Sequence, residues 1–187
     1  VVSGIELFSP KFNVVPPAVN ESFYFPYTKT EERVIAEQQN LADLLFTRED
    51  PERVFGYLDD PQKRPIFSIA RLDRIKNLTG LTECFGKSKA LQEECNLILV
   101  AGKLRVEDSN DQEEIDEIEK LYQIIDEYQL HGKIRWLGVM LPKADSGEIY
   151  RIIADRQGIF VQPALFEAFG LTVLESMITG LPTFATQ

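Results

Sequence analysis

The sequence has few of the residues that bind metal ions or form disulfides. Among its 187 residues there is one histidine, and the two cysteines, Cys84 and Cys95, form no CxxC pair. A single histidine cannot supply a cluster of ligands, so we expect no metal in the site. We interpret the cysteines as buried free thiols in a reducing compartment, which predicts a cytoplasmic protein. A chain of this length buries enough apolar surface to fold without cross-links.

Positive charge and long apolar runs are also scarce. The chain has 20 Lys and Arg against 30 Asp and Glu, which gives a formal net charge of −10. Nucleic acids and anionic membranes bind basic surfaces, so we expect neither as a partner. No apolar run approaches the roughly 18 residues that span a membrane. An anionic ligand must therefore be held by a local group of cations, against the overall charge.

Three common signatures of nucleotide and hydrolase sites are missing. The sequence contains no G-x-G-x-x-G after a predicted strand, no G-x-x-x-x-G-K-[ST] and no G-x-S-x-G. These absences exclude the nicotinamide or flavin fingerprint, the P-loop and the serine-hydrolase elbow. The acidic residues between 107 and 119 fall opposite the apolar positions of a predicted helix, so we interpret them as a solvated face.

Short apolar runs alternate with amphipathic stretches over most of the chain. The runs predict strands at 66–70, 96–101, 133–137, 158–162 and 182–186, and the stretches predict helices at 31–46, 78–89, 111–130, 146–155 and 169–180. Gly132 is placed to cap the helix at 111–130, and 48–65 is expected to be a loop. Strands that are apolar throughout are buried on both faces. The pattern therefore predicts a Rossmann-like α/β domain with a doubly wound parallel sheet.

The N-terminal part of the chain does not read as a core of its own. Residues 1–28 are rich in proline and aromatic residues, and 11–15 reads as a short strand that Pro16 ends. We expect 1–28 to be a linker between domains and 29–187 to be the folded domain. The chain opens at Val1 rather than at a methionine, so we also expect a fragment.

A first group of candidate site residues follows the strand at 66–70. In doubly wound sheets, ligands bind at the carboxyl ends of strands where the winding reverses. Arg71 leaves such an end, and Lys76 lies five residues on, close to the start of a helix. A guanidinium fork, an ammonium and free helix N–H groups suit a diphosphate. The alternative is that both are exposed charges of a basic loop.

A second group follows the strand at 158–162. Glu167 and Glu175 are eight positions apart and lie on either side of Gly170, where the backbone can approach a ligand closely. Carboxylates accept strong hydrogen bonds from sugar hydroxyls. A helix cap and a solvated helix residue are the alternative, and a carboxylate pair can also indicate glycoside hydrolysis. Together the two groups predict a site for a sugar attached to a diphosphate.

These residues resemble motifs of a known family. Glu167 and Glu175, with the Phe169-Gly170-Leu171 core between them, resemble the E-x7-E motif of the retaining glycosyltransferases of family 4. Arg71 and Lys76 resemble the pair that holds the donor diphosphate in that family. Similarity to the sucrose synthase group of the family extends over 4–14, 24–27, 70–81, 147–151, 153–155, 160–164 and 180–186.

The resemblance implies a two-domain GT-B enzyme of which this chain is the C-terminal, donor-binding half. It implies that the N-terminal acceptor domain is missing and that the donor domain is truncated at its C-terminus. The implied reaction is reversible glucosyl transfer between a nucleoside-diphosphate glucose and fructose, which gives sucrose with retention of configuration. The fragment alone is expected to be inactive, and the full-length enzyme is expected to be a homotetramer. No cofactor is implied beyond the substrate nucleotide, UDP or ADP.

The resemblance also implies a role for each site residue. Arg71, Lys76 and Glu167 would be catalytic, the cations on the leaving diphosphate and the carboxylate on glucose hydroxyls. The remaining donor-binding residues would be Phe169, Gly170, Leu171 and Thr172, with Glu175 on the ribose hydroxyls.

The base region departs from the plant pattern. Plant members of the sucrose synthase group carry Gln and Asn where this chain has Met140 and Ser146. This departure leaves uridine and adenosine both open and fits a bacterial type of enzyme. Two alternatives also stay open. One is sucrose-phosphate synthase or another family 4 glycosyltransferase, and the other is a non-catalytic α/β module that binds nucleotides.

Overall fold

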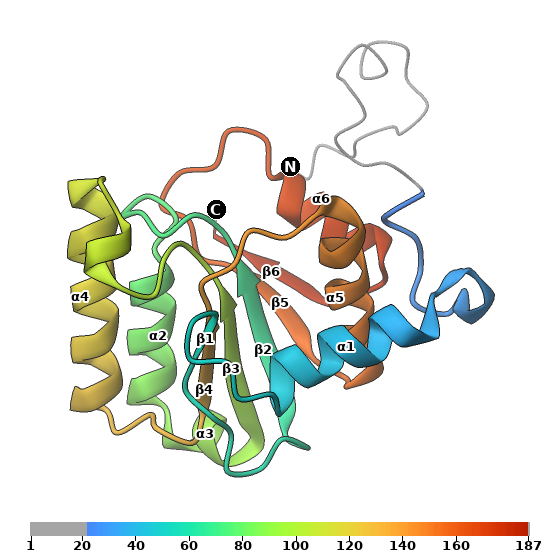
Figure 1. The fold of residues 1–187 in the computed structure, drawn as a ribbon. Helices are drawn as coiled ribbons and strands as arrows, with labels where there is room; N and C mark the ends of the chain where they lie inside the picture. Colours follow the sequence, from blue (N-terminus) through green and yellow to red (C-terminus); the bar gives the residue numbers. More distant parts are fainter. Residues whose placement is uncertain (1–21, 187) are drawn as a thin grey trace.

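A six-stranded sheet forms the centre of the computed structural model, which describes residues 22–186 (Figure 1). The strands are β1 (Val54–Phe55), β2 (Arg64–Ile69), β3 (Cys95–Val100), β4 (Ile134–Leu137), β5 (Ile159–Gln162) and β6 (Thr183–Ala185). They lie in the order β1-β4-β3-β2-β5-β6. The expected strand at 11–15 lies outside the described residues.

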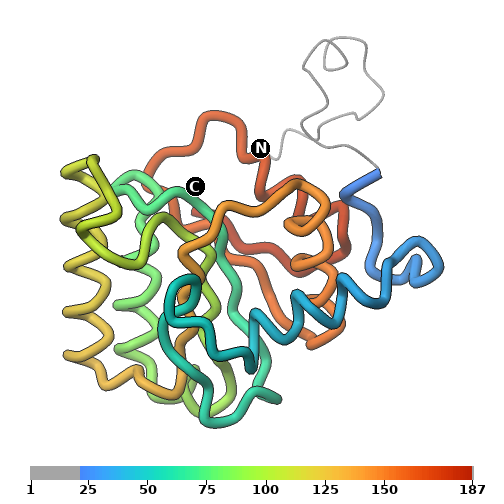
Figure 2. The backbone as a smooth tube through the Cα atoms, viewed as in Figure 1, coloured from blue at the N-terminus to red at the C-terminus, as the bar shows by residue number. Residues whose placement is uncertain are grey.

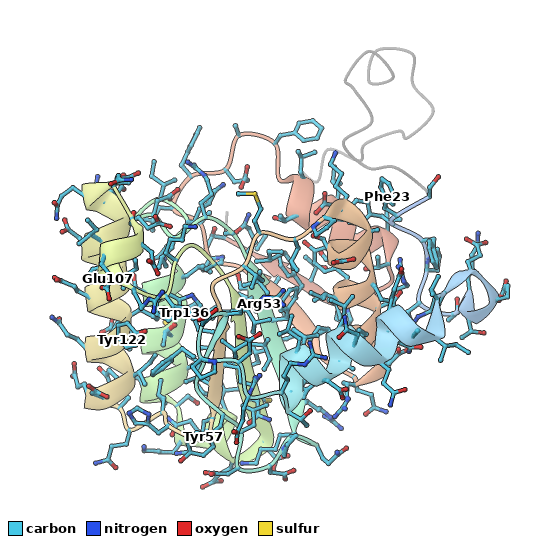
Figure 3. The ribbon with its side chains drawn as sticks, viewed as in Figure 1. Phe23, Arg53, Tyr57, Glu107, Tyr122 and Trp136 are labelled. Atoms are coloured by element: carbon cyan, nitrogen blue, oxygen red, sulfur yellow. The ribbon has the colours of Figure 1, made fainter. Side chains whose placement is uncertain are left out.

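The parallel sheet is confirmed, with one addition. Strands β2 to β6 pair in parallel, whereas β1 pairs antiparallel with β4 at the sheet edge. The prediction of a loop over 48–65 was therefore wrong at β1. Two residues are too short for a hydrophobic period to show, and this strand depends on its contacts. The Phe55 ring packs edge-on against Tyr122 and Trp136, with the Tyr122 centroid 4.8 Å away. Figure 3 labels Tyr122 on α4 and Trp136 on β4.

The winding of the sheet reverses between β2 and β5. The chain runs outward from β2 through β3 to β4, returns to β5 on the other side of β2, and continues to β6. Ile66 pairs with Ile159 and Phe67 with Phe160, so the two central strands end at the same edge. A doubly wound sheet binds its ligands at this edge, beside the reversal.

Helices cover both faces of the sheet (Figures 1 and 2). They are η1 (Thr30–Glu32), α1 (Ile35–Phe46), α2 (Leu78–Lys87), α3 (Lys89–Glu94), η2 (Val106–Asp108), α4 (Gln112–Glu127), α5 (Lys143–Asp155) and α6 (Leu171–Ile178). Helices α2 and α4 pack together on one face, and α1 packs with α5 on the other. Along β3, Ile98 joins the core on the α1–α5 side, while Leu97 and Leu99 join the core under α2 and α4. None of the helices described between 22 and 186 has the length and apolarity of a membrane span.

Three local expectations were wrong. Helix α4 ends at Glu127 rather than near Gly132, because Gln129 takes a left-handed conformation with φ of 54° and turns the chain. The cysteines are not buried: Cys84 is exposed, off the buried stripe of α2, and Cys95 is half-buried at the first residue of β3. Glu117 does not belong to a solvated face, since it is buried against α2, where Thr79 Oγ1 donates to its carboxylate at 2.6 Å.

The segment before α1 is attached to the domain at Phe23 to Phe25 and at Arg33. Arg33 forms an ion pair with Glu148 at 2.6 Å and another with Asp155 at 2.7 Å, both on α5. Arg151, on the same helix, donates to the carbonyl of Phe23 at 2.8 Å (Figure 3). The division of the chain at residue 28 stays a prediction.

A buried arginine joins α1 to the sheet edge. Arg135, on β4, is only 2% exposed, and its guanidinium donates to the carbonyls of Leu44 and Arg48 at 2.8 Å each and of Gly56 at 3.3 Å. Leu44 lies in the last turn of α1, where carbonyls have no partner within the helix and carry partial negative charge. The guanidinium thus supplies hydrogen-bond donors to three backbone carbonyls, one of which lies at the end of α1.

Arg135→Met is expected to lower the free energy of unfolding by about 2–4 kcal/mol, because three carbonyls lose a charged donor. Arg64→Met is the matched control, since Arg64 is exposed on β2. Urea unfolding of both variants and of the unsubstituted protein measures the difference. Equal midpoints for the two variants would contradict a structural role for Arg135.

Candidate functional site

The loops after β2 and β5 are tied together at the reversal of the sheet. The backbone N–H of Leu165 donates to the carbonyl of Ile75 at 2.8 Å. The side-chain amide of Asn77 donates to the carbonyl of Pro163 at 3.1 Å. Asn77 has a left-handed φ of 56° and immediately precedes α2. The two groups of residues predicted from the sequence therefore lie side by side.

Lys76 and Glu167 meet across these two loops. Lys76 Nζ lies 2.7 Å from Glu167 Oε2, and both side chains are largely shielded from solvent. Glu167 Oε1 accepts from the backbone N–H of Gly170 at 3.2 Å. The hydrogen bond from Lys76 is the main cause that lowers the pKa of Glu167. The backbone N–H of Gly170 lowers the pKa less, and partial burial opposes the shift. The carboxylate is therefore ionised at neutral pH.

Gln162 is a site residue that the sequence reasoning missed. It ends β5, is 3% exposed, and its amide donates to Glu167 Oε2 at 3.0 Å and to Thr172 Oγ1 at 3.2 Å. Its own Oε1 has no hydrogen-bond partner among the described residues. The sequence feature that could have identified Gln162 is its position as a polar residue at the end of the apolar run Ile-Phe-Val. Gln162 fixes the direction of the Glu167 carboxylate.

Asp73 shapes the loop that carries the two cations. Its Oδ1 accepts from the backbone N–H of Lys76 at 2.9 Å. Its Oδ2 lies 3.0 Å from the Arg71 guanidinium, without the geometry of a hydrogen bond. The Arg71 side chain is 81% exposed and does not join the Lys76–Glu167 pair. Its guanidinium thus stands in solvent at the end of β2.

A cavity of about 600 Å³ opens beside Arg71, along the carboxyl ends of β2, β3 and β4. Arg71, Met140 and Ser146 all line it, so the structure brings these three predicted residues together. Met140 is 99% exposed, and Ser146 Oγ donates to the carbonyl of Pro142 at 3.2 Å. Lys76 and the two predicted glutamates are not among the lining residues.

Glu175 lies apart from Glu167, on the side of α6 that faces α5. Tyr150 OH donates to its Oε2 at 3.4 Å. Burial raises the pKa of Glu175, whereas hydrogen bonds from Tyr24 and Tyr150 oppose that shift. The two predicted glutamates therefore occupy opposite electrostatic environments, one beside a cation and the other in a pocket of tyrosines.

The loop from Phe169 to Leu171 presents backbone rather than side-chain donors. Gly170 has φ of 75° and forms the N-cap of α6 without any side-chain hydrogen bond. A residue with a Cβ would be strained at this φ. Leu171 begins the helix, and Thr172 accepts from Gln162. The backbone N–H groups of Phe169 and Gly170, just before α6, both donate to Glu167 Oε1, at 3.5 Å and 3.2 Å. Within 22–186, no three His, Cys, Asp or Glu residues gather as a possible metal site.

Residues 50–187 match the family model described as glycosyl transferases group 1. The chain belongs to this family. Residues 1–46 match a second model, described as the sucrose synthase first GT-B domain. The match to the group 1 glycosyl transferases covers the whole sheet and every candidate site residue predicted from the sequence.

Curated relatives are similar to the chain along its whole length. It is 76% identical over 187 residues to the sucrose synthase of Thermosynechococcus vestitus, covering 100% of this chain and 23% of that protein. It is 50% identical over 186 residues to sucrose synthase 2 of Arabidopsis thaliana, covering 100% of this chain and 23% of that protein. The chain thus spans about a quarter of the length of these relatives.

Solved structures share the fold. The C-terminal domain of the group 1 glycosyl transferase LpcC from Francisella tularensis aligns with a TM-score of 0.59 at 16% identity, covering 89% of this chain and 69% of that one. The catalytic domain of starch synthase IV from Arabidopsis thaliana aligns with a TM-score of 0.52 at 17% identity, covering 93% and 30%. These glycosyl transferases confirm the α/β Rossmann-like fold.

Lys76→Met is expected to lower the free energy of unfolding by about 0.5–1 kcal/mol at pH 7, because it removes a partly buried ion pair. Lys76 lowers the folded-state pKa of Glu167, so the pair stabilises the protein above the unfolded value of about 4.3. That stabilisation is lost as the pH falls through the folded-state pKa. The difference between the variant and the unsubstituted protein should therefore vanish in acid.

Lys87→Met is the matched control. Lys87 pairs with Glu83 at 2.6 Å on the exposed face of α2, where water screens the charges. Lys87 also lowers the pKa of Glu83, but in full contact with water, so urea unfolding at several pH values should show a smaller pH-dependent loss for this variant than for Lys76→Met. A Lys76→Met difference that persists in acid would contradict the assignment of the pair.

Proposed function

We propose that the chain is the donor-binding part of a longer sucrose synthase. That enzyme transfers glucose reversibly between a nucleoside-diphosphate glucose and fructose and retains the anomeric configuration. The observation that carries the proposal is the Lys76–Glu167 pair beside Gly170 at the reversal of the sheet. It stands in a chain that is 76% identical to a sucrose synthase over its full length.

The diphosphate of the donor would take the place that Glu167 now occupies beside Lys76. The Lys76 ammonium would then pair with phosphate oxygens. The exposed Arg71 would fold over the phosphates, and two N–H groups of its guanidinium would donate to their oxygens. Charge develops on the diphosphate as the glycosidic bond breaks. Lys76, already in place, and Arg71, once folded over the phosphates, would stabilise that charge.

The glucose would lie over the loop after β5. Glu167, released from Lys76 but still held by Gln162, would accept hydrogen bonds from glucose hydroxyls. The N–H groups of Phe169, Gly170 and Leu171 would donate to sugar or phosphate oxygens, helped by the positive end of α6. Glu167 is not proposed as a nucleophile.

The nucleotide would extend from the diphosphate into the cavity beside Arg71. Its volume of about 600 Å³, its position at the ends of β2 to β4, and its lining by Met140 and Ser146 support it as the base pocket. Glu175 would accept from the ribose hydroxyls. UDP and ADP both fit this proposal, which requires no cofactor besides the substrate nucleotide.

The remaining assignments depend on the similarity to sucrose synthases. Fructose would bind in an acceptor domain outside the described residues, and the full-length enzyme would be a cytoplasmic homotetramer. Sedimentation of the full-length enzyme tests the assembly, and acceptor assays with fructose and fructose 6-phosphate separate a sucrose synthase from a sucrose-phosphate synthase.

Titration calorimetry of the full-length enzyme with UDP and ADP tests the donor site. Arg71→Ala and Lys76→Ala are each expected to weaken binding by at least about tenfold to a hundredfold, because each removes charge-assisted hydrogen bonds to phosphate. Arg74→Ala is the matched control, since Arg74 is an exposed cation of the same loop. Unchanged affinity in both site variants would refute the diphosphate clamp.

The 187-residue chain alone is expected to make no sucrose from UDP-glucose or ADP-glucose and fructose, because the proposed fructose site lies in the acceptor domain. The full-length enzyme assayed in parallel provides the positive control. Turnover by the purified chain would overturn the division of donor and acceptor sites between two domains.

A further inference from the structure

The segment before α1 sends an aromatic side chain to the second glutamate of the site. Tyr24 is 2% exposed and Phe25 is 6% exposed, so the chain is packed tightly here. The N–H of Tyr27 donates to the carbonyl of Thr179 at 3.0 Å, which fixes the segment to the end of α6. Tyr24 is therefore held between α5 and α6 rather than lying loosely on them.

Two tyrosine hydroxyls converge on the Glu175 carboxylate. Tyr150, which is fully buried on α5, donates to Oε2 at 3.4 Å. The Tyr24 ring packs on the Tyr150 ring, with centroids 6.3 Å apart and a tilt of 54°, and its hydroxyl lies near enough to the same carboxylate to lower the pKa of Glu175. Burial and the negative charge of Glu175 raise the pKa of both phenols, so each stays protonated and serves as a donor.

The surroundings of Glu175 contain little else that could hold a charge. Among the described residues, Lys143, at the start of α5, is the one cation that lowers the pKa of Glu175, and it does so less than the two hydroxyls. Burial outweighs these three groups and raises the pKa of Glu175 above its usual value. Each hydroxyl therefore matters for keeping the carboxylate ionised.

We propose that Tyr24 is a positioning residue of the nucleotide site, which orients Glu175 for the ribose hydroxyls. This inference rests on the proposed function. A carboxylate has about four lone-pair directions, and two are taken by Tyr24 and Tyr150. The others stay free to accept from a ribose, aimed by two rigid phenols.

Tyr24 and Glu175 belong to the matches of two different family models. Tyr24 lies in the stretch that matches the first GT-B domain model and outside the match to group 1 glycosyl transferases, which begins at residue 50. The donor site thus depends on a side chain from the segment that precedes its own domain match. A donor domain cut at the match boundary would lose this hydroxyl.

The test compares Tyr24→Phe with Tyr27→Phe in the full-length enzyme. Tyr27 lies in the same segment, and its hydroxyl has no hydrogen-bond partner among residues 22–186. Dissociation constants for UDP and ADP are measured from pH 5 to pH 8. We expect Tyr24→Phe to weaken binding about tenfold at the acidic end of this range and less at pH 8. Loss of the hydroxyl raises the pKa of Glu175 further, so affinity falls from a higher pH as the carboxylate is protonated.

A double-mutant cycle separates positioning from general packing. In a Glu175→Gln background, Tyr24→Phe should cause no further loss and no shift of the pH profile, because its target is gone. Additive losses, or a Tyr24→Phe profile equal to that of Tyr27→Phe, would overturn the inference. Failure of the unsubstituted enzyme to bind either nucleotide, or unchanged binding by Glu175→Gln, would instead refute the proposed donor site.

A second probe covers the case in which Tyr24→Phe does not fold. A 3-fluorotyrosine at position 24 keeps the ring and makes the hydroxyl a stronger donor. We expect it to move the fall in affinity to lower pH. An unmoved profile would again overturn the inference.

Discussion

Parallel pairing of β2 with β5 places the loops that follow these strands at one edge of the sheet, and the candidate site depends on that contact. The chain leaves β2 in one direction and β5 in the other, so no secondary structure fills the space between the two loops. Lys76 comes from one loop and Glu167 from the other, and their 2.7 Å ion pair spans the gap. A ligand that carries both phosphate and hydroxyl groups can replace this pair with partners for each charge.

The cations of the candidate site each lie beside a carboxylate, in a protein with more acidic than basic residues. In a protein with a net charge of −10, Lys76 and Arg71 place two cations after β2, where the winding of the sheet reverses. Glu167 neutralises Lys76 in the absence of ligand, and Asp73 lies beside Arg71. In the proposed complex, these acidic partners would give way to a more highly charged anion. Glu175 lies apart from Lys76 and Glu167, beside Tyr150, which suits the separate role proposed for it at the ribose.

The sequence was informative where the physics is local. Apolar runs identified five strands because burial on both faces demands continuous hydrophobicity, and the reversal rule located Arg71, Lys76 and Glu167. Sequence reasoning missed β1, whose two residues are stabilised by the ring of Phe55 packed on β4 and α4. It also placed Cys84 in the core, although helical spacing puts this residue beside the buried stripe of α2. Contacts between distant segments, such as that of Tyr24 with Glu175, leave no periodic signal.

The packed unit extends across the boundary between the two family matches. The two family models meet between residues 46 and 50, yet α1 packs on α5 and Arg33 pairs with Glu148 on that helix. Arg135 adds a second link, from β4 to the end of α1. Residues 23–46 are therefore part of the same packed unit as the sheet. Tyr24 is fixed by this packing, so the geometry of the proposed nucleotide site and the attachment of the N-terminal segment depend on the same contacts.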